Sequence, residues 1–386
     1  MNNITTTAAL AEFCATCAKH PYVTVDTEFL RERTYYSQLC LVQMAYPGND
    51  DSSAALIDTL APGIDLEPLY DLFRNEAVLK VFHAARQDLE IFVLNADVMP
   101  VPFFDTQVAA MVCGFGDQVG YDTLVRKITK AHIDKSSRFT DWSRRPLTAA
   151  QMTYALADVT HLRDVYEFLA AELERRNRGH WVKEELAVLT APETYRTDPD
   201  KAWERVKTRN NNGKFLAIVR ELAAFRETDA QTRDVPRSRV MKDDAILELA
   251  ALRPTAMDEL GRARLLQREG RKPAVSEAIL AAIARGMACP AAKQPKVDEP
   301  PQRKQGSGAL GDLLRVLLKA KSDDADVAAK LLANASDLED LASEDAPNVP
   351  CMKGWRYEVF GADALRLKAG KIALSAGPKG VEIVAR

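Results

Sequence analysis

The sequence predicts an α/β domain, in which a mixed sheet is flanked by helices, followed by all-α helical bundles. Two observations support this fold class. In the first two hundred residues, short β-rich runs occur in succession with helical segments between and after them, which is typical of a sheet covered by helices. From about residue 203 onward the pattern is helical instead, in short pieces bounded by Pro, Gly or Asp.

The elements of the α/β domain follow from local composition and spacing. The expected strands are the β-rich runs at 22–29, 40–46, 54–58 and 79–83. Residues 65–75 and 86–96 have the apolar spacing of helices. A long amphipathic helix is expected over 147–176, where Thr148 is the predicted N-cap and Gln151 completes a capping box.

The chain length implies several domains. Its 386 residues exceed what one hydrophobic core usually supports. The predicted division is an α/β domain (1–195), a helical domain (203–290), a linker (291–308) and a C-terminal module (309–386). The linker is rich in Pro, Lys and Gln and has almost no bulky apolar residue. The C-terminal module is expected to end in a strand pair closed by a turn at 377–380.

Composition indicates the class of protein. Apolar residues make up 47% and charged residues 28%, a normal globular balance. No apolar run approaches the roughly 20 residues of a membrane helix, and the N-terminus lacks the basic and then apolar segments of a secretory signal. We therefore expect a soluble, cytoplasmic protein that does not contact a membrane. Because no interface pattern stands out, we expect a monomer.

Six cysteines in a chain of this length do not form a disulfide framework. Cys14 and Cys17 have a zinc-like spacing, and His20 lies just beyond them. Structural zinc normally needs four ligands, however, and no second pair lies nearby. The favoured interpretation is that both cysteines belong to an Ala-rich amphipathic helix, and a metal or redox role is the alternative.

The net charge of −3 is unevenly distributed along the chain. It is −10 over residues 1–200, +6 over residues 201–290 and +1 over the remainder. This asymmetry suggests that the middle segment meets an anion, whereas the first segment concentrates carboxylates for another purpose. The alternative is chance variation on solvated helix faces.

Two carboxylates stand in the middle of the first predicted core strand. Asp26 and Glu28 are two residues apart, so their side chains project from the same face of the sheet. Two like charges in a partly buried place are unfavourable unless a cation neutralises them. Hard oxygen ligands favour Mg²⁺ or Mn²⁺ over zinc. The alternative is that both carboxylates lie at a solvated sheet edge.

Further acidic residues and a tyrosine occur on predicted helices. Asp88 lies at the start of the helix that follows the strand at 79–83, where it can face the edge of the sheet. Tyr154 and Asp158 are four residues apart on the long helix and therefore share a face. Taken singly, each of these residues has an ordinary explanation, as a helix N-terminal charge or a surface carboxylate beside a packed tyrosine.

Together, Asp26-x-Glu28, Asp88 and Tyr154-x3-Asp158 resemble, in order and separation, the three exonuclease motifs of the DEDD superfamily. The tyrosine marks the DEDDy branch. The flanking sequences DTEFLRERTYYSQLCLVQ, FHAARQDLEIF and DKSSRFTDWSRRPLTAAQMTYALADV are similar to those of the ribonuclease D family. This resemblance implies a ribonuclease H-like fold for the α/β domain.

The resemblance continues beyond the α/β domain. The sequence FLAIVRELAAFRETDAQTRDVPRSRVMKDDAILELAALRPTAMDEL is similar to an HRDC domain, a helical nucleic-acid-binding module, over about 210–288. The C-terminal module resembles a second, more divergent HRDC-like repeat. These similarities imply that the partner is RNA.

The family resemblance implies a 3′–5′ exoribonuclease that trims structured RNA, such as tRNA precursors, and releases 5′-mononucleotides. Two divalent ions, Mg²⁺ or Mn²⁺, are implied as cofactors. Asp26 would bridge both ions, Glu28 and Asp158 would complete the shell of the first, and Asp88 would hold the second. Tyr154 would orient the attacking water, since its free pKa near 10 makes it a poor general base at neutral pH.

The acidic α/β domain should repel RNA, so the basic helical domain is expected to supply phosphate contacts. The candidate RNA-binding residues are Arg220, Arg226, Arg233, Arg237, Arg239 and Lys242. Two alternatives remain open. One is a 3′–5′ DNA exonuclease, because nothing in the ligand set distinguishes ribose from deoxyribose. The other is a catalytically silent nucleic-acid-binding scaffold.

Overall fold

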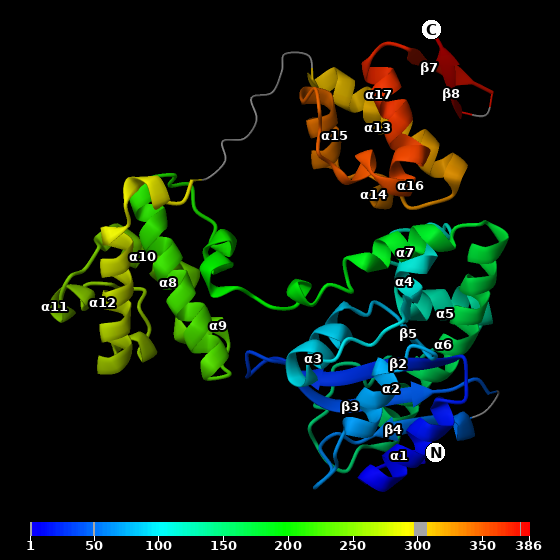
Figure 1. Ribbon diagram of the computed structural model, residues 1–386, viewed down its shortest axis with the longest axis horizontal. Helices are drawn as coiled ribbons and strands as arrows, with labels where there is room; N and C mark the ends of the chain where they lie inside the picture. Colours follow the sequence, from blue (N-terminus) through cyan, green and yellow to red (C-terminus); the bar gives the residue numbers. More distant parts are fainter. Residues whose placement is uncertain (1, 49–50, 297–306, 379) are drawn as a thin grey trace.

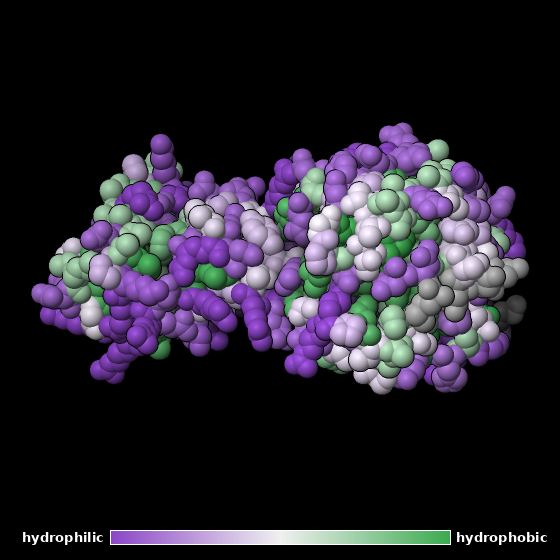
Figure 2. Space-filling view, turned by 90° about the horizontal axis from the view of Figure 1, so that it is seen from below, coloured by the Kyte–Doolittle hydropathy of each residue, from purple (hydrophilic) through white to green (hydrophobic). Residues whose placement is uncertain are grey.

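The computed structural model describes residues 2–48, 51–296, 307–378 and 380–386. The first 190 residues form the α/β domain, and an extended segment leads from it to a helical bundle that lies to one side (Figure 1). The C-terminal module lies against the α/β domain, beside α4 and α7 (Figure 1). In the space-filling view the bundle is a separate lobe joined to the rest by a narrow waist (Figure 2).

The sheet of the α/β domain is mixed, as predicted, and its central strand is β2. In spatial order the strands are β1 (Asn2–Ile4), β4 (Ala54–Ile57), β3 (Gln38–Ala45), β2 (Tyr22–Leu30), β5 (Leu79–Phe82) and β6 (Phe103–Asp105). Strand β2 pairs antiparallel with β3 and parallel with β5. The four predicted strands are confirmed. The short edge strands β1 and β6 were not predicted, because three residues carry no readable alternation.

Helices cover both faces of the sheet. They are α1 (Thr7–Cys17), α2 (Glu67–Arg74), α3 (Arg86–Ala96), α4 (Thr106–Val112), α5 (Tyr121–Thr129), α6 (Ala149–Arg175) and α7 (Gly179–Ala187). The side chains of Val23 and Val25 are fully buried in one core cluster with residues of α1, α2 and α3. On the opposite face, α6 packs over β3 and β4 in a second cluster that includes Trp142 and Val159. The alternation of β2 therefore turns Thr24, Asp26 and Glu28 toward α6.

Helix α6 begins as the sequence predicts. The hydroxyl of Thr148 accepts from the amide of Gln151 at 3.2 Å, and the side chain of Gln151 accepts from the amide of Thr148 at 3.0 Å. This reciprocal capping box satisfies amides that the first helical turn leaves unpaired. It fixes the start of the helix that carries two of the predicted site residues.

The cysteine pair on α1 belongs to the hydrophobic core. Cys14 and Cys17 are both buried, and burial raises the pKa of Cys14 to about 12. His20 does not join them; its ring stacks on Tyr46 with the centroids 4.6 Å apart. Across the described residues, the cluster able to hold a metal lies elsewhere. The structural interpretation of this pair is therefore supported.

The helical bundle has its own hydrophobic cluster. Its helices are α8 (Gly213–Thr232), α9 (Arg237–Val240), α10 (Asp243–Leu252), α11 (Met257–Leu260) and α12 (Pro273–Ala288), with short turns at Pro199–Arg205, Glu269–Arg271 and Ala291–Lys293. A further turn, Pro192–Thr194, precedes the bundle. Helix α8 is the longest and packs against α10, α12 and the turn Pro199–Arg205. This arrangement confirms the all-α prediction for the second part of the chain.

The C-terminal module contains helices followed by a hairpin. Its elements are α13 (Ser307–Ala325), α14 (Ala329–Leu332), α15 (Ala335–Ser343), Pro350–Met352, α16 (Gly354–Arg356), Tyr357–Gly361, α17 (Ala362–Lys368), β7 (Ile372–Gly377) and β8 (Gly380–Ala385). Strands β7 and β8 pair antiparallel, so the predicted strand pair is present. Lys379 in its turn and residues 297–306 of the predicted linker lie outside the described residues.

The C-terminal module and the α/β domain share one hydrophobic cluster. The rings of Trp181 on α7 and Trp355 on α16 stack with centroids 4.3 Å apart and planes inclined by 14°. The indole of Trp355 also donates to Glu185 at 2.9 Å. Arg176 forms an ion pair with Asp326 at 2.7 Å.

Within the described part of the chain, every helix is too short or too polar to cross a bilayer.

Candidate active site

Three of the predicted carboxylates meet in space. One oxygen from each of Asp26, Glu28 and Asp158 lies within 4.8 Å of the other two. Asp26 and Glu28 are half-buried on β2, and Asp158 is buried on α6. Residues more than 130 positions apart in the chain thus form one acidic cluster.

The contact between β2 and α6 sets this arrangement. The hydroxyl of Thr24 donates to the backbone carbonyl of Val159 at 2.8 Å. Thr24 lies two residues before Asp26 on the same face of the strand, and Val159 follows Asp158 on the helix. This buried hydrogen bond joins the two elements next to the acidic cluster.

The fourth carboxylate, Asp88, is close to the cluster but does not belong to it. It lies in the first turn of α3, is 6% exposed and accepts a hydrogen bond from the hydroxyl of Thr27. Asp105 holds the start of α3 in place, because its carboxylate accepts from the amides of Ala84 at 3.0 Å and Ala85 at 2.9 Å. Ala84 has a positive φ of 59°, so this turn is sharp.

Tyr154 is also placed as predicted. It lies one helical turn before Asp158 on α6, and the two side chains influence each other's pKa: the carboxylate raises that of the phenol, and the phenol lowers that of the carboxylate. Its ring packs against Trp142, with the centroids 6.2 Å apart. Burial and the nearby carboxylates raise the pKa of Tyr154 above its ordinary value, so the phenol stays protonated at neutral pH.

A cavity of about 350 Å³ opens beside these groups. Asp26, Asp88, Tyr154 and Asp158 line it, whereas Glu28 belongs to the cluster without lining the cavity. The structure thus brings the five predicted site residues to one place.

Other lining residues escaped the sequence reasoning. They are His83, Tyr121, Lys135 and Arg138. His83 contacts Thr106 through Nδ1 at 2.9 Å, while its buried Nε2 has no partner among the residues described. Their positions in the sequence offered a weak indication. His83 ends a predicted strand, and Lys135 and Arg138 lie in the segment DKSSRFTDW, which has no regular apolar spacing.

The carboxylates of the site carry raised pKa values. Desolvation is the largest cause for Asp26, Glu28, Asp88 and Asp158, and for all but Asp26 a neighbouring negative charge is the next cause. Clustered acids of this kind are unfavourable when ionised together unless cations compensate them. Oxygen-only donors in such a group fit hard divalent ions.

Nearby cations compensate the cluster only in part. Lys135 is engaged in an ion pair with Asp122 at 2.7 Å. Arg138 lowers the pKa of Glu28 and Asp158, but this effect is smaller than that of burial. The donor set therefore fits divalent metal ions, which would remove the remaining repulsion.

The loop that carries Arg138 is anchored on both sides. The guanidinium of Arg145 donates two hydrogen bonds, of 2.7 and 2.6 Å, to the carboxylate of Asp58. It also donates to the carbonyl of Cys40 at 2.7 Å. Gln151 donates to the hydroxyl of Thr140 at 3.1 Å. These contacts fasten the loop to the sheet and to the first turn of α6.

The predicted RNA-binding residues of the helical bundle have different surroundings. Arg226 is 5% exposed and forms an ion pair with Asp243 at 2.5 Å. This places its guanidinium inside the bundle rather than on a surface that phosphate can reach, which corrects the expectation for Arg226. The apolar spacing of α8 could not reveal this, because the arginine occupies a position of the buried face.

Ion pairs also engage Arg220, with Glu221 at 3.3 Å, and Arg233, with Asp229 at 2.9 Å and Glu269 at 2.8 Å.

Three further candidates lie on or near α9. Arg237 pairs with Glu227 at 2.5 Å and faces the α/β domain. Arg239 and Lys242 are exposed, and neither has an ion-pair partner in the described portion of the chain. Four of the six candidate residues, Arg220, Arg226, Arg233 and Arg237, are thus already engaged in ion pairs.

Arg237 belongs to a contact between the two domains, which we term the Tyr35 latch. Its residues are Tyr35 of the α/β domain and Glu227, Gln231, Asp234 and Arg237 of the bundle. The hydroxyl of Tyr35 donates to Glu227 and accepts from Arg237 at 2.8 Å. The backbone amide of Tyr35 donates to Asp234 at 3.0 Å. Glu227 is 1% exposed, so these charges are shielded from solvent.

Comparison with profiles of protein families gives two matches. Residues 1–174 match a family described as 3′-5′ exonuclease, and residues 215–283 match the HRDC domain. The first match contains all five residues of the candidate site.

Curated relatives match along the full chain. A ribonuclease D of Jannaschia sp. (strain CCS1) is 61% identical over 383 residues, which cover 99% of each protein. A ribonuclease D of Nitrobacter hamburgensis is 51% identical over 375 residues, which cover 97% of each protein.

Solved structures have the same architecture. The crystal structure of Escherichia coli RNase D, described as an exoribonuclease involved in structured RNA processing, matches with a TM-score of 0.81 and 29% identity over 96% of this chain and 99% of that one. A protein from Bifidobacterium adolescentis matches with a TM-score of 0.70 over 96% of this chain and 97% of that one; its 21% identity speaks for the fold alone.

Proposed function

The chain belongs to the ribonuclease D family of 3′–5′ exoribonucleases, and on this premise we propose that it trims the 3′ ends of structured RNA, such as tRNA precursors, and releases 5′-mononucleotides. One observation carries the proposal: Asp26, Glu28 and Asp158 form an acidic cluster beside a cavity that Asp88 and Tyr154 also line. The relative from E. coli, described as acting in structured RNA processing, supports the substrate class.

We propose two Mg²⁺ or Mn²⁺ ions as the cofactors. The charge of Asp26 raises the pKa of Glu28, Asp88 and Asp158 alike, which supports Asp26 as the residue that would contact both ions. Glu28 and Asp158 would hold one ion, and Asp88 would hold the other. When bound, such a pair of cations stabilises the negative charge on the attacking and leaving oxygens of a phosphodiester.

The protein's own side chains supply position and charge. Tyr154 remains protonated, so it acts as a hydrogen-bond donor that orients water rather than as a base. Arg138 lines the cavity without a carboxylate partner among the described residues, which leaves its guanidinium available to the scissile phosphate.

The test compares Asp26→Asn with the unaltered protein on a tRNA carrying extra 3′ nucleotides and on a DNA strand of matching sequence, with Mg²⁺ present. We expect the unaltered protein to shorten the RNA from its 3′ end and Asp26→Asn to be inactive. Undiminished digestion by Asp26→Asn would remove the site assignment. Preference for DNA would overturn the RNA assignment, and inactivity of the unaltered protein on both would favour the scaffold alternative.

A further inference from the structure

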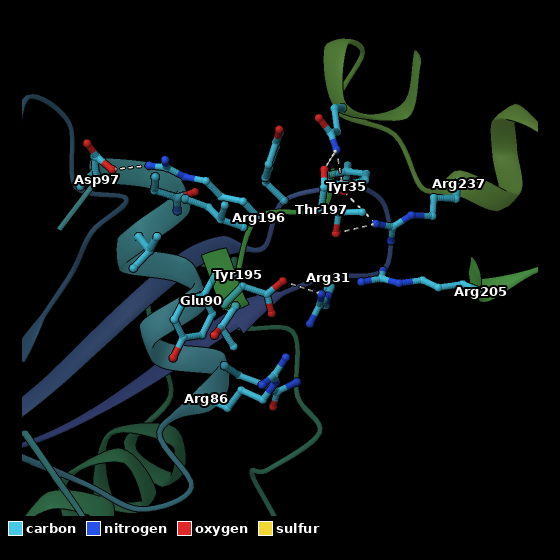
Figure 3. Close-up of a pocket in the computed structure, with 18 residues that line it drawn as sticks. Arg31, Tyr35, Arg86, Glu90, Asp97, Tyr195, Arg196, Thr197, Arg205 and Arg237 are labelled. Carbon is cyan, nitrogen blue, oxygen red and sulfur yellow. Dashed lines mark hydrogen bonds and ion pairs between the residues drawn. The ribbon is translucent and has the colours of Figure 1, made fainter. Parts of the chain in front are cut away.

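A second cavity, about 1010 Å³ in volume, lies between the α/β domain and the helical bundle (Figure 3). We term it the interdomain cleft. Residues of α3, of the loop after β2, of the segment 194–197 and of the bundle line it. It is about three times as large as the cavity at the acidic cluster.

The interdomain cleft is strongly basic, although the α/β domain carries a net charge of −10 over residues 1–200. The cationic residues that line it are Arg31, Arg86, Arg196, Arg205 and Arg237. Against these five arginines, the lining contains two carboxylates, Glu90 and Asp97, and Arg237 is paired with Glu227 of the Tyr35 latch. A cationic cleft on an acidic domain indicates a polyanionic ligand.

Two of the arginines are not neutralised. Arg31 pairs with Glu90 at 3.0 Å and Arg196 with Asp97 at 2.5 Å, and these two pairs are drawn as dashed lines in Figure 3. Arg86 and Arg205, by contrast, are exposed and have no carboxylate partner among the described residues.

Figure 3 shows Arg86 at the start of α3 and Arg205 reaching from the bundle side toward Arg31. Unpaired guanidinium groups on opposite walls of one cleft are suited to successive phosphates of a nucleic-acid backbone.

The interdomain cleft adjoins the candidate active site. Gln87 lines both cavities, and it stands between Arg86 in the cleft and Asp88 at the site. A strand whose last phosphodiester lies at the acidic cluster must pass its preceding nucleotides out of the smaller cavity. The shared residue Gln87 places the interdomain cleft next to the smaller cavity, on a route open to these nucleotides.

The size of the smaller cavity favours a single strand over a duplex as the occupant. A cavity of about 350 Å³ accommodates one nucleotide at the acidic cluster, not a base pair. The half-buried ring of Tyr36 lines the cleft and offers a face for stacking an unpaired base.

We propose that the interdomain cleft binds the unpaired 3′ tail of the RNA, with Arg86 and Arg205 contacting backbone phosphates upstream of the scissile bond. This inference rests on the proposed function, since it takes the acidic cluster as the place of cleavage. It specifies the substrate class further: the protein requires a tail several nucleotides long, and RNA paired up to its last nucleotide is a poor substrate.

The test measures binding without cleavage. Two fluorescent RNA hairpins, one with a single unpaired 3′ nucleotide and one with a long unpaired tail, are titrated with full-length protein in EDTA. For the long tail, we expect Arg86→Gln/Arg205→Gln to weaken binding about tenfold or more and to lower the salt slope of log Kd by about 1.4, since each single-strand phosphate contact contributes about 0.7. The short tail should lose much less affinity.

The matched control is Arg262→Gln/Arg264→Gln, which removes the same charge from exposed positions of the bundle outside the cleft. We expect this control to bind both hairpins as the unaltered protein does. Equal affinity of the Arg86→Gln/Arg205→Gln variant and the control for the long tail would overturn the proposal, as would equal losses for both hairpins.

A second measurement does not depend on the variants. Photocrosslinking from 4-thiouridine in the tail should label peptides containing residues 31–36 or 194–205, and labelling confined to other segments would contradict the cleft. Digestion of the long-tailed RNA by the unaltered protein with Mg²⁺ is assayed separately. Failure of digestion with intact tail binding would count against the proposed function and not against the cleft.

Discussion

The hydroxyl of Thr27 on the central strand donates a hydrogen bond to the carboxylate of Asp88 on α3. Thr27 points away from the acidic cluster that its neighbours Asp26 and Glu28 join, yet it holds the fourth carboxylate of the site. The strand therefore positions carboxylates on both of its sides. This relationship makes Thr27 a positioning residue.

Replacement of Thr27 by valine tests this role. Valine keeps the shape and the strand propensity but removes the donor, so Asp88 loses its orientation. We expect Thr27→Val to lower kcat about tenfold or more and to require more Mg²⁺ for half-maximal rate. Thr27→Ser, which keeps the hydroxyl, should restore most of the activity. A purely structural role would lower the melting temperature of Thr27→Val without altering the Mg²⁺ requirement.

Removal of the Tyr154 hydroxyl should separate turnover from metal binding. Tyr154→Phe keeps the ring that packs on Trp142 and removes the hydroxyl whose pKa the carboxylate of Asp158 raises. If this group orients water, we expect kcat to fall about a hundredfold. Titration calorimetry should show a nearly unchanged Mg²⁺ affinity, and a large loss of affinity would show that the phenol acts mainly through Asp158.

Metal affinity should depend on pH with a defined sign. Burial raises the pKa values of Asp26, Glu28, Asp88 and Asp158, so protons compete with cations for the same oxygens. We expect the apparent Kd for Mg²⁺ to fall as pH rises from about 6 to about 8, with proton release on binding. Calorimetry in buffers of different ionisation enthalpy measures that release. A Kd for Mg²⁺ that does not change with pH would contradict the raised pKa values of these carboxylates.

Acid should loosen the Tyr35 latch. Burial alone would raise the pKa of Glu227, but hydrogen bonds from Arg237 and Tyr35 outweigh it, and the pKa lies below its ordinary value. A lowered carboxylate pKa stabilises the closed arrangement at neutral pH, and this contribution is lost as pH falls below about 4.5 through the folded-state pKa.

Small-angle scattering and a variant check this prediction. We expect the radius of gyration to increase on acidification, and Glu227→Gln to show the increase already at neutral pH. Glu221→Gln, which alters an acidic residue on the same helix outside the latch, serves as the control. An unchanged radius of gyration for Glu227→Gln would show that the latch does not hold the domains together.

A buried lysine of the sheet should contribute strongly to stability. Lys80 on β5 is fully buried, and its ammonium donates to the carbonyls of Asn75 at 2.9 Å, Val78 at 2.8 Å and Val101 at 2.6 Å. Lys80→Met leaves these acceptors without that donor and should lower the free energy of unfolding by about 2–4 kcal/mol. Chemical denaturation measures this change, and exposed Lys19→Met should change it by less than about 0.5 kcal/mol.

The site residues could be predicted from the sequence because the spacing within each pair shows that its two side chains share one face of a strand or helix. Asp26 and Glu28 share a strand face, and Tyr154 and Asp158 share a helix face, so each pair could be oriented locally. That these pairs meet depends on the packing of α6 against the sheet, which includes the contact between Thr24 and Val159 and which no local pattern encodes. Only the family resemblance predicted that the two pairs and Asp88 come together in one site.

The RNA-binding surface was harder to predict, since charge along a sequence does not reveal ion pairing. Arg226 reads as a basic residue of a basic domain, yet it is buried against Asp243. Arg86 and Arg205 lie 119 positions apart and belong to different segments, so no sequence window contains both. They line the same cleft only because the two domains pack together.

The aromatic stack of Trp181 and Trp355 lies in a core that belongs to both ends of the chain. Because the α/β domain cannot lose the C-terminal helices without exposing that core to water, the two should melt as one cooperative unit, and the bundle between them as another. The unit formed by the α/β domain and the C-terminal module can therefore complete its folding only after the ribosome has made the C-terminal helices. Removal of the C-terminal module at the linker would therefore leave an incompletely folded protein whose exposed apolar surface promotes aggregation.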